Sequence, residues 1–156
     1  PSQVLQFAVT ELGDDQELLT GGAIESYRLV YSDGGAATLT LLAGQWRDET
    51  GPQTRLDGVL EQVTAELGEV PEAGDVDDAA PADDADGTAG TPTDDAGPAP
   101  APVQGPVKVG EQVVGRYVFV PREDGTGTLW WTNSTVFLQL DGPSAALRDV
   151  FKAFPL

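Results

Sequence analysis

The sequence predicts an α+β protein whose antiparallel sheet is built from two strand-hairpin-helix units, with the helices packed on one face. Three observations predict this fold. Apolar runs flank short glycine turns in each half of the chain, helix-period apolar patterns follow them, and a long acidic stretch separates the halves. We therefore divide the 156 residues into an N-terminal ββα lobe (1–68), a linker (69–105) and a C-terminal βββα lobe (106–156), and expect the lobes to pack as one domain.

The first part of the N-terminal lobe is expected to be mostly strand. Residues 4–10 form a strand in this interpretation, and residues 14–19 form a short helix. The apolar runs 24–33 and 36–46 then predict a hairpin through Gly34-Gly35, because paired glycines tolerate the positive φ angles of tight turns.

A helix follows the hairpin. Thr54 and Asp57 resemble a capping box, and Gly68 stands where a helix-ending glycine belongs. The apolar face of this helix is spaced at i, i+3, i+4, i+7 and i+11, and it consists of Leu56, Val59, Leu60, Val63 and Leu67.

The linker, residues 69–105, has the composition of a disordered segment. It holds proline, alanine, glycine, aspartate and threonine, and valine is its only large apolar residue. Residues 71–105 carry 9 acidic and no basic side chains. Such a segment cannot bury enough apolar surface to offset the entropy lost on ordering, so we expect it to be disordered and extended.

The C-terminal lobe repeats the plan of the N-terminal one. A strand at 113–121 precedes two strands that turn at Asn133-Ser134, and a helix begins near Ser144. The helix is expected to end at Pro155, which cannot continue it. Its apolar face consists of Leu147, Val150, Phe151 and Phe154.

The stretch TLWWTNSTVFLQL contains two adjacent tryptophans, and each side chain needs something to bury it. Neighbouring strand residues point to opposite faces, so Trp130 and Trp131 cannot enter the same core. We expect Trp131 to be buried against Leu147 and Phe151. Trp130 is then covered either by the N-terminal lobe or by a partner molecule. The residues predicted to form this second surface are Trp130, Phe137, Tyr117 and Phe119.

Composition excludes several classes of chemistry. Cysteine and histidine are both absent, which removes disulfides, the usual zinc ligands and any Ser-His-Asp arrangement. The formal net charge of −18 argues against nucleic-acid binding. The sequence contains no apolar run of about 20 residues, so no membrane-spanning segment is predicted. We therefore expect no catalytic residue, cofactor or metal site. Asn133-Ser134-Thr135 fits the glycosylation acceptor pattern, which makes Asn133 a candidate for modification.

The segments GGAIESYRLVYSDGGAATLTLLAGQW, VGEQVVGRYVFV and LWWTNSTVFLQLDGPSAALRDVFKAF carry a resemblance to known proteins. Their layout resembles that of small, lipoprotein-like extracytoplasmic modules of bacteria and archaea, in which a strand-hairpin-helix unit follows an anchor. The resemblance implies a secreted, periplasmic or cell-surface location. Because the chain starts at Pro1 rather than at methionine, removal of an N-terminal targeting or anchoring segment is compatible with the sequence.

Two functions are compatible with these observations. The leading hypothesis is a non-enzymatic interaction module that binds another protein as an accessory subunit of a larger surface or membrane-associated assembly. The alternative is a small-molecule or glycan-binding domain that uses Trp130, Phe137 and Tyr117 as a stacking platform. A deep pocket lined by Trp130 favours the second hypothesis, and a flat aromatic patch favours the first.

Overall fold

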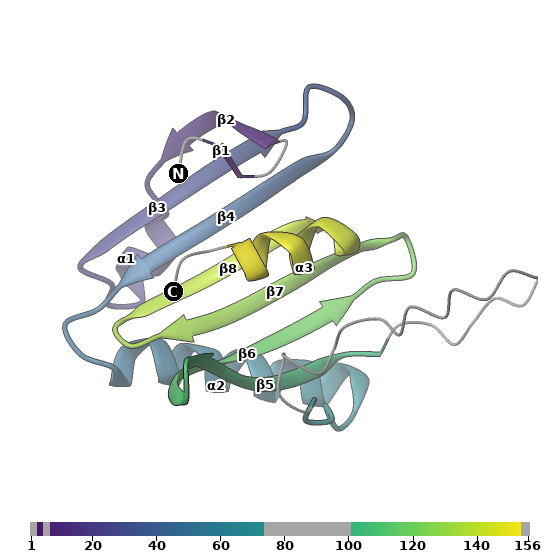
Figure 1. Cartoon of the computed structure of the whole chain (residues 1–156). Coiled ribbons are helices and arrows are strands. Elements are labelled where there is room, and N and C mark those ends of the chain that lie inside the picture. The colour runs from purple at the N-terminus through teal and green to yellow at the C-terminus, as the bar shows by residue number, and fades with distance from the viewer. Residues whose placement is uncertain (1–2, 5–6, 74–100, 154–156) are drawn as a thin grey trace, which may run out of the picture.

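A computed structural model describes residues 3–4, 7–73 and 101–153 of the chain. These residues form eight strands and three helices (Figure 1). In chain order the elements are β1 (Gln3–Val4), β2 (Phe7–Gly13), α1 (Gln16–Thr20), β3 (Glu25–Ser32), β4 (Thr38–Gln45), α2 (Thr50–Leu67), β5 (Val103–Val109), β6 (Gln112–Pro121), β7 (Thr126–Asn133), β8 (Val136–Pro143) and α3 (Ser144–Ala153).

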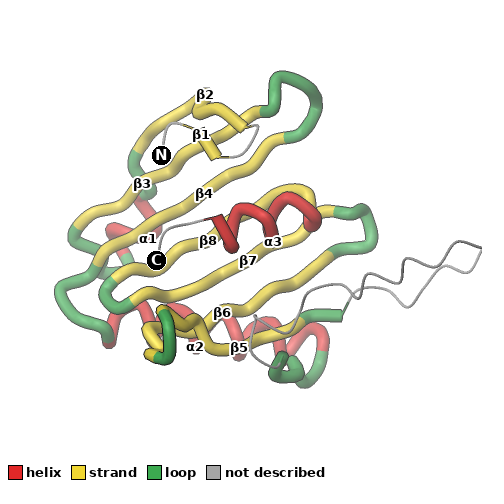
Figure 2. Tube along the Cα trace, in the orientation of Figure 1, coloured by secondary structure: helices red, strands yellow, loops and turns green. Residues whose placement is uncertain are grey.

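The eight described strands belong to one antiparallel sheet with the order β1-β2-β3-β4-β8-β7-β6-β5. The strands of the two halves of the chain meet where β4 pairs with β8, with Leu41 opposite Leu140. The sheet therefore runs without a break through both halves (Figure 2). The fold class is α+β, as the sequence predicts.

The expectation that the helices pack on one face is wrong. α3 packs on β7 and β8 from the front of the sheet, whereas α2 packs on β6, β7 and β8 from behind (Figure 1). The cause is that these strands are apolar on both faces: Trp131 points toward α3, and Val118 and Phe137 point toward α2. Because α2 covers the C-terminal strands rather than its own β3–β4 hairpin, the layout of two strand-hairpin-helix units is not confirmed.

The N-terminal elements agree with the sequence prediction in kind and differ in their bounds. β3 and β4 form the predicted hairpin, whose loop places Gly34 at a φ of 84°. α1 begins after Asp15, whose carboxylate accepts a hydrogen bond from the backbone N–H of Leu18 at 2.9 Å. The strand predicted at residues 4–10 corresponds to β2, which begins only at Phe7.

α2 begins earlier than predicted. Thr54 and Asp57 lie inside the helix, so their assignment as a capping box is wrong. Pro52 occupies the first turn, where the backbone N–H groups have no partner within the helix and a proline is tolerated. The predicted end is confirmed, because Gly68 has a φ of 89° and its N–H donates to the carbonyl of Thr64 at 2.9 Å.

The C-terminal end of the predicted linker, residues 69–105, is a strand. β5 pairs with β6, and Val103 lies opposite Phe119. Its sequence, VQGPVKV, contains glycine and proline, which by composition indicate a loop. Both residues have a place in this edge strand. An edge strand tolerates proline, and Gly105 leaves room for Tyr117, whose ring carbon Cε1 would lie 2.9 Å from a Cβ atom there.

The N-terminal end of the predicted linker is also ordered. Val70 is buried, and the chain after it makes a parallel bridge to the start of β5. The N–H of Ala73 donates to the carbonyl of Gln104 at 2.7 Å, and the N–H of Gln104 donates to the carbonyl of Pro71 at 3.1 Å. The predicted linker is thus too long at both ends. Residues 74–100 lie outside the described residues.

The β7–β8 turn is centred one residue later than predicted. Its two turn residues are Ser134 and Thr135, so Asn133 pairs with Val136, and Ser134 has a φ of 51°. A turn displaced by one residue moves each cross-strand partner by two positions. Since side chains alternate with a period of two, every side chain keeps its face. Trp131 therefore points to the predicted side of the sheet.

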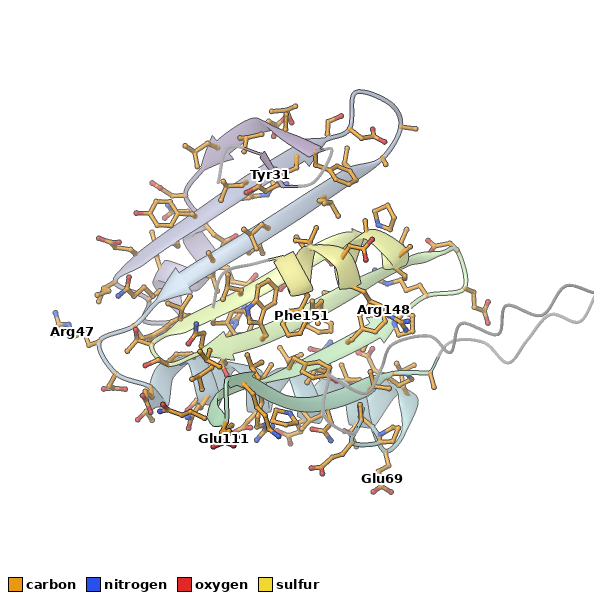
Figure 3. All side chains as sticks on the ribbon, viewed as in Figure 1. Tyr31, Arg47, Glu69, Glu111, Arg148 and Phe151 are labelled. Carbon is orange, nitrogen blue, oxygen red and sulfur yellow. The ribbon has the colours of Figure 1, made fainter. Side chains whose placement is uncertain are left out.

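Two apolar cores lie on the two faces of the sheet. The core under α3 contains Trp131, which is fully buried together with Leu147. The rings of Trp131 and Phe151 meet edge to face, with centroids 5.6 Å apart. Phe151 is labelled on α3 in Figure 3. The prediction for Trp131 is thus confirmed. The core under α2 contains Leu18, Ala23, Trp46, Leu56, Val118 and Phe137.

Gly115 is a position where the packing of β6 on β7 requires glycine. A Cβ atom at this residue would lie 1.8 Å from the carbonyl oxygen of Thr132, which leaves no space for any side chain. We predict that Gly115→Ala lowers the free energy of unfolding by at least about 2 kcal/mol in urea denaturation. The matched control is Gly13→Ala in β2, where a Cβ atom would meet nothing within 4 Å. Equal stability of the two variants would contradict the described approach of the strands.

Candidate functional site

The four aromatic residues predicted to share one surface lie on two faces of the sheet. In the β6–β7 ladder Tyr117 lies opposite Trp131, and Phe119 lies opposite Leu129. Tyr117 and Phe119 therefore belong to the core under α3, whereas Phe137 and Trp130 belong to the side covered by α2. The predicted grouping is wrong. Its cause is the register of β6 against β7, which the sequence analysis did not assign.

Tyr117 and Phe119 act as core residues. The ring of Tyr117 lies 5.5 Å from that of Phe151, and the guanidinium of Arg148 lies 5.4 Å from the centroid of Phe119. Phe151 and Arg148 are labelled in Figure 3. Burial raises the pKa of Tyr117 above its ordinary value of 10.0, and the charge of Arg148 opposes that rise. Neither aromatic ring is open to a ligand.

Phe137 is also closed off, from the other side. It is 1% exposed, and the ring of Trp46 meets it edge to face at 6.4 Å. The guanidinium of Arg55, a residue of α2, lies 5.8 Å from the centroid of Phe137. Residues of the N-terminal half of the chain therefore cover Phe137 on this face of the sheet.

Trp130 differs from the other three aromatic residues because it is half-buried beside a cavity. This cavity has a volume of about 660 Å³ and lies between α2 and the strands β6–β8. Val59 and Val63 of α2 form one wall, and Trp130 and Gln139 of the sheet form another. Arg122 also lines it. We refer to this space as the Trp130 cavity.

A chain of hydrogen bonds fixes the polar groups beside Trp130. The indole N–H of Trp130 donates to Oε1 of Gln139 at 3.0 Å, and Nε2 of Gln139 donates to Oδ2 of Asp141 at 2.8 Å. The hydroxyl of Thr128 donates to the other oxygen of Asp141, and Arg122 donates to that hydroxyl at 2.8 Å. Every member is held by its neighbour, so the indole ring and the amide are oriented before any ligand binds.

The charge lining the Trp130 cavity is close to balanced. The whole chain, in contrast, has a formal net charge of −18. It favours a neutral ligand over a strongly charged one. The charged residues that line the cavity are three carboxylates and two guanidiniums: Glu17, Glu66, Glu123, Arg55 and Arg122.

Asn133, the candidate for glycosylation, lies half-buried at the end of β7. The two residues after it are tied to the N-terminal half of the chain. The hydroxyl of Ser134 donates to Oε1 of Glu49 at 3.0 Å, and the N–H of Trp46 donates to the carbonyl of Thr135 at 2.8 Å. Glycosylation at Asn133 stays a prediction.

Among the described residues, no group of three or more acidic, histidine or cysteine side chains is placed to hold a metal ion. No helix within the described ranges has the length and apolarity needed to cross a membrane.

Apart from Trp130, the residues that line the cavity were not predicted as site residues from the sequence. Alternation along β8 puts Gln139 on the face of Trp130, and that signal is readable in the sequence. The contribution of Arg55 and Val59 has no such signal, because it depends on where α2 packs after it leaves β4. No family model, curated protein or solved structure matches the chain.

Trp130→Ala tests whether α2 is the cover of this residue. Trp130 packs against the core that contains Leu56 of α2, as Val59 and Leu60 do, so we predict a loss of about 1–3 kcal/mol in the free energy of unfolding. The control is Tyr27→Ala, which removes an aromatic ring that is 46% exposed and should change the stability by less than about 0.5 kcal/mol. Urea denaturation of both variants measures the difference. An unchanged stability for Trp130→Ala would mean that a partner, not α2, covers this side chain.

Proposed function

We propose that this protein is a non-enzymatic binding module, and that the Trp130 cavity holds a neutral ligand with a ring, such as a sugar unit of a glycan. The observation that carries the proposal is the half-buried indole of Trp130 beside a cavity of about 660 Å³, held in place through Gln139. An apolar pocket with a few oriented polar groups is the usual form of a small-ligand site.

The chemistry of the cavity supports a sugar in particular. One face of a sugar ring carries C–H groups that stack on an aromatic side chain, and its edge carries hydroxyl groups that need hydrogen-bond partners. Trp130 offers the stacking surface, while Gln62, Gln139 and Arg122 offer amide and guanidinium groups around it. The balanced charge of the lining disfavours a strongly charged ligand.

Binding to another protein is a second candidate, and a different surface favours it. Leu12 of β2 is 70% exposed and Tyr27 of β3 is 46% exposed. Leu12 lies opposite Leu29, and Tyr27 is two residues from Leu29 on the same face, so the two exposed side chains are neighbours. This pair supports the hypothesis of an accessory subunit in an extracytoplasmic assembly. A partner bound at Leu12 and Tyr27 would lie away from Trp130, unlike the partner surface that the sequence predicts.

Nuclear magnetic resonance tests the ligand site. We predict that a neutral oligosaccharide shifts the indole resonance of Trp130 and the side-chain amide of Gln139. The probes are maltohexaose, cellohexaose and hexa-N-acetylchitohexaose, and the Trp130→Phe variant assigns the resonance. Trp131 is the internal control, because it is fully buried on the opposite face and should not respond.

A second titration, in which a candidate partner protein replaces the oligosaccharide, distinguishes the two candidate functions. Shifts at Leu12 and Tyr27, upon addition of a candidate partner protein, would favour the accessory-subunit hypothesis. If none of the three oligosaccharides moves the Trp130 resonance, the proposal that this cavity binds a neutral glycan is refuted.

A further inference from the structure

A second cavity adjoins the Trp130 cavity along α2. The second cavity has a volume of about 610 Å³ and shares with the first the side chains of Glu17, Arg55, Val59 and Gln62. Together the two cavities follow one side of α2 from Gly51 to Leu67, a distance of about 24 Å at 1.5 Å per residue. The two cavities adjoin at Arg55, which lines both, and we call this place the junction and the two cavities together the groove.

Arg55 forms an ion pair with Glu17 at the junction, and a ligand can displace this contact. Nη2 of Arg55 donates to Oε1 of Glu17, and this contact joins α2 to α1. The two side chains are 32% and 77% exposed, so the pair is a surface ion pair that contributes little to stability. Hydroxyl groups of a ligand can replace part of the contact with Glu17 at small cost, because both side chains remain near water.

Glycine residues give the second cavity a smooth wall. Gly51 lets the ring of Trp46 lie against α2, since a Cβ atom there would be 2.2 Å from Cδ1 of Trp46. Gly58 lines the same cavity, and a Cβ atom at this residue would meet nothing within 4 Å. Thr54 and Gln62 add a hydroxyl and an amide. The second cavity therefore offers neutral polar groups like the first, whereas its aromatic residue, Trp46, is only 7% exposed and belongs to the wall.

We infer that the ligand is a linear neutral oligosaccharide that fills both cavities and passes Arg55 at their junction. This inference rests on the proposed function. An extended peptide fits less well, because peptides laid on a sheet pair with an open strand edge. The strands behind the groove, β4, β8, β7 and β6, are each paired on both sides within the described sheet.

Gly58→Leu is the variant that separates the two cavities. The leucine side chain would enter the second cavity without displacing a neighbour, and replacing a helical glycine should favour the helix. Glu61→Leu is the matched control, because Glu61 belongs to the same helix, is exposed, and lines neither cavity. Calorimetric titration compares maltose with maltohexaose, cellobiose with cellohexaose, and di-N-acetylchitobiose with hexa-N-acetylchitohexaose.

For the series that binds, we expect the hexamer to bind at least about tenfold more tightly than the dimer, because it engages two linked subsites. Gly58→Leu should remove that gain and leave the affinity for the dimer unchanged, whereas Glu61→Leu should change neither. Equal affinities for dimer and hexamer, or a hexamer unaffected by Gly58→Leu, would overturn the inference and leave the Trp130 site standing. Binding of no oligosaccharide, or tighter binding of a neutral Ser/Thr/Ala hexapeptide, would overturn both.

Discussion

Two adjacent tryptophans that must point to opposite faces of one strand determine how the rest of this structure is arranged. Trp131 enters the core under α3, and Trp130 with Phe137 needs cover on the other side. A tryptophan buries on the order of 150–250 Å² of surface. At roughly 25 cal/mol per Å², this corresponds to a gross gain of about 4–6 kcal/mol. That gain is the reason for a helix on each face of strands β6–β8.

The position of α2 follows from this requirement and creates the groove. The helix leaves β4, crosses behind the sheet and lies on β6, β7 and β8, so it does not cover β3 and β4. On the same face Arg28 of β3 is exposed, and Thr40 of β4 is half-buried. The helix forms one wall of each of the two cavities, which lie along it. The arrangement that covers Phe137 therefore also leaves Trp130 partly open to a ligand.

Local patterns in the sequence predicted the parts of the fold that depend on neighbouring residues. The period of two predicted the faces of Trp130 and Trp131, and the spacing from Leu56 to Leu67 predicted α2. Contacts between distant segments could not be predicted in this way. The alignment of Tyr117 with Trp131 depends on the register of two strands, and the side on which α2 packs depends on residues more than 60 positions later. β5 was missed because an edge strand can contain proline and glycine.

One continuous sheet, joined through β4 and β8, unites the two halves of the chain. Native-state hydrogen exchange of the backbone amides in β4 and β8 tests this claim most directly. If the claim holds, amides such as those of Leu41 and Leu140 exchange only through global unfolding, with the free energy that denaturation measures for the whole protein. Exchange of the β4 amides at a lower free energy than those of β7 would show that the halves open separately, and would contradict the claim.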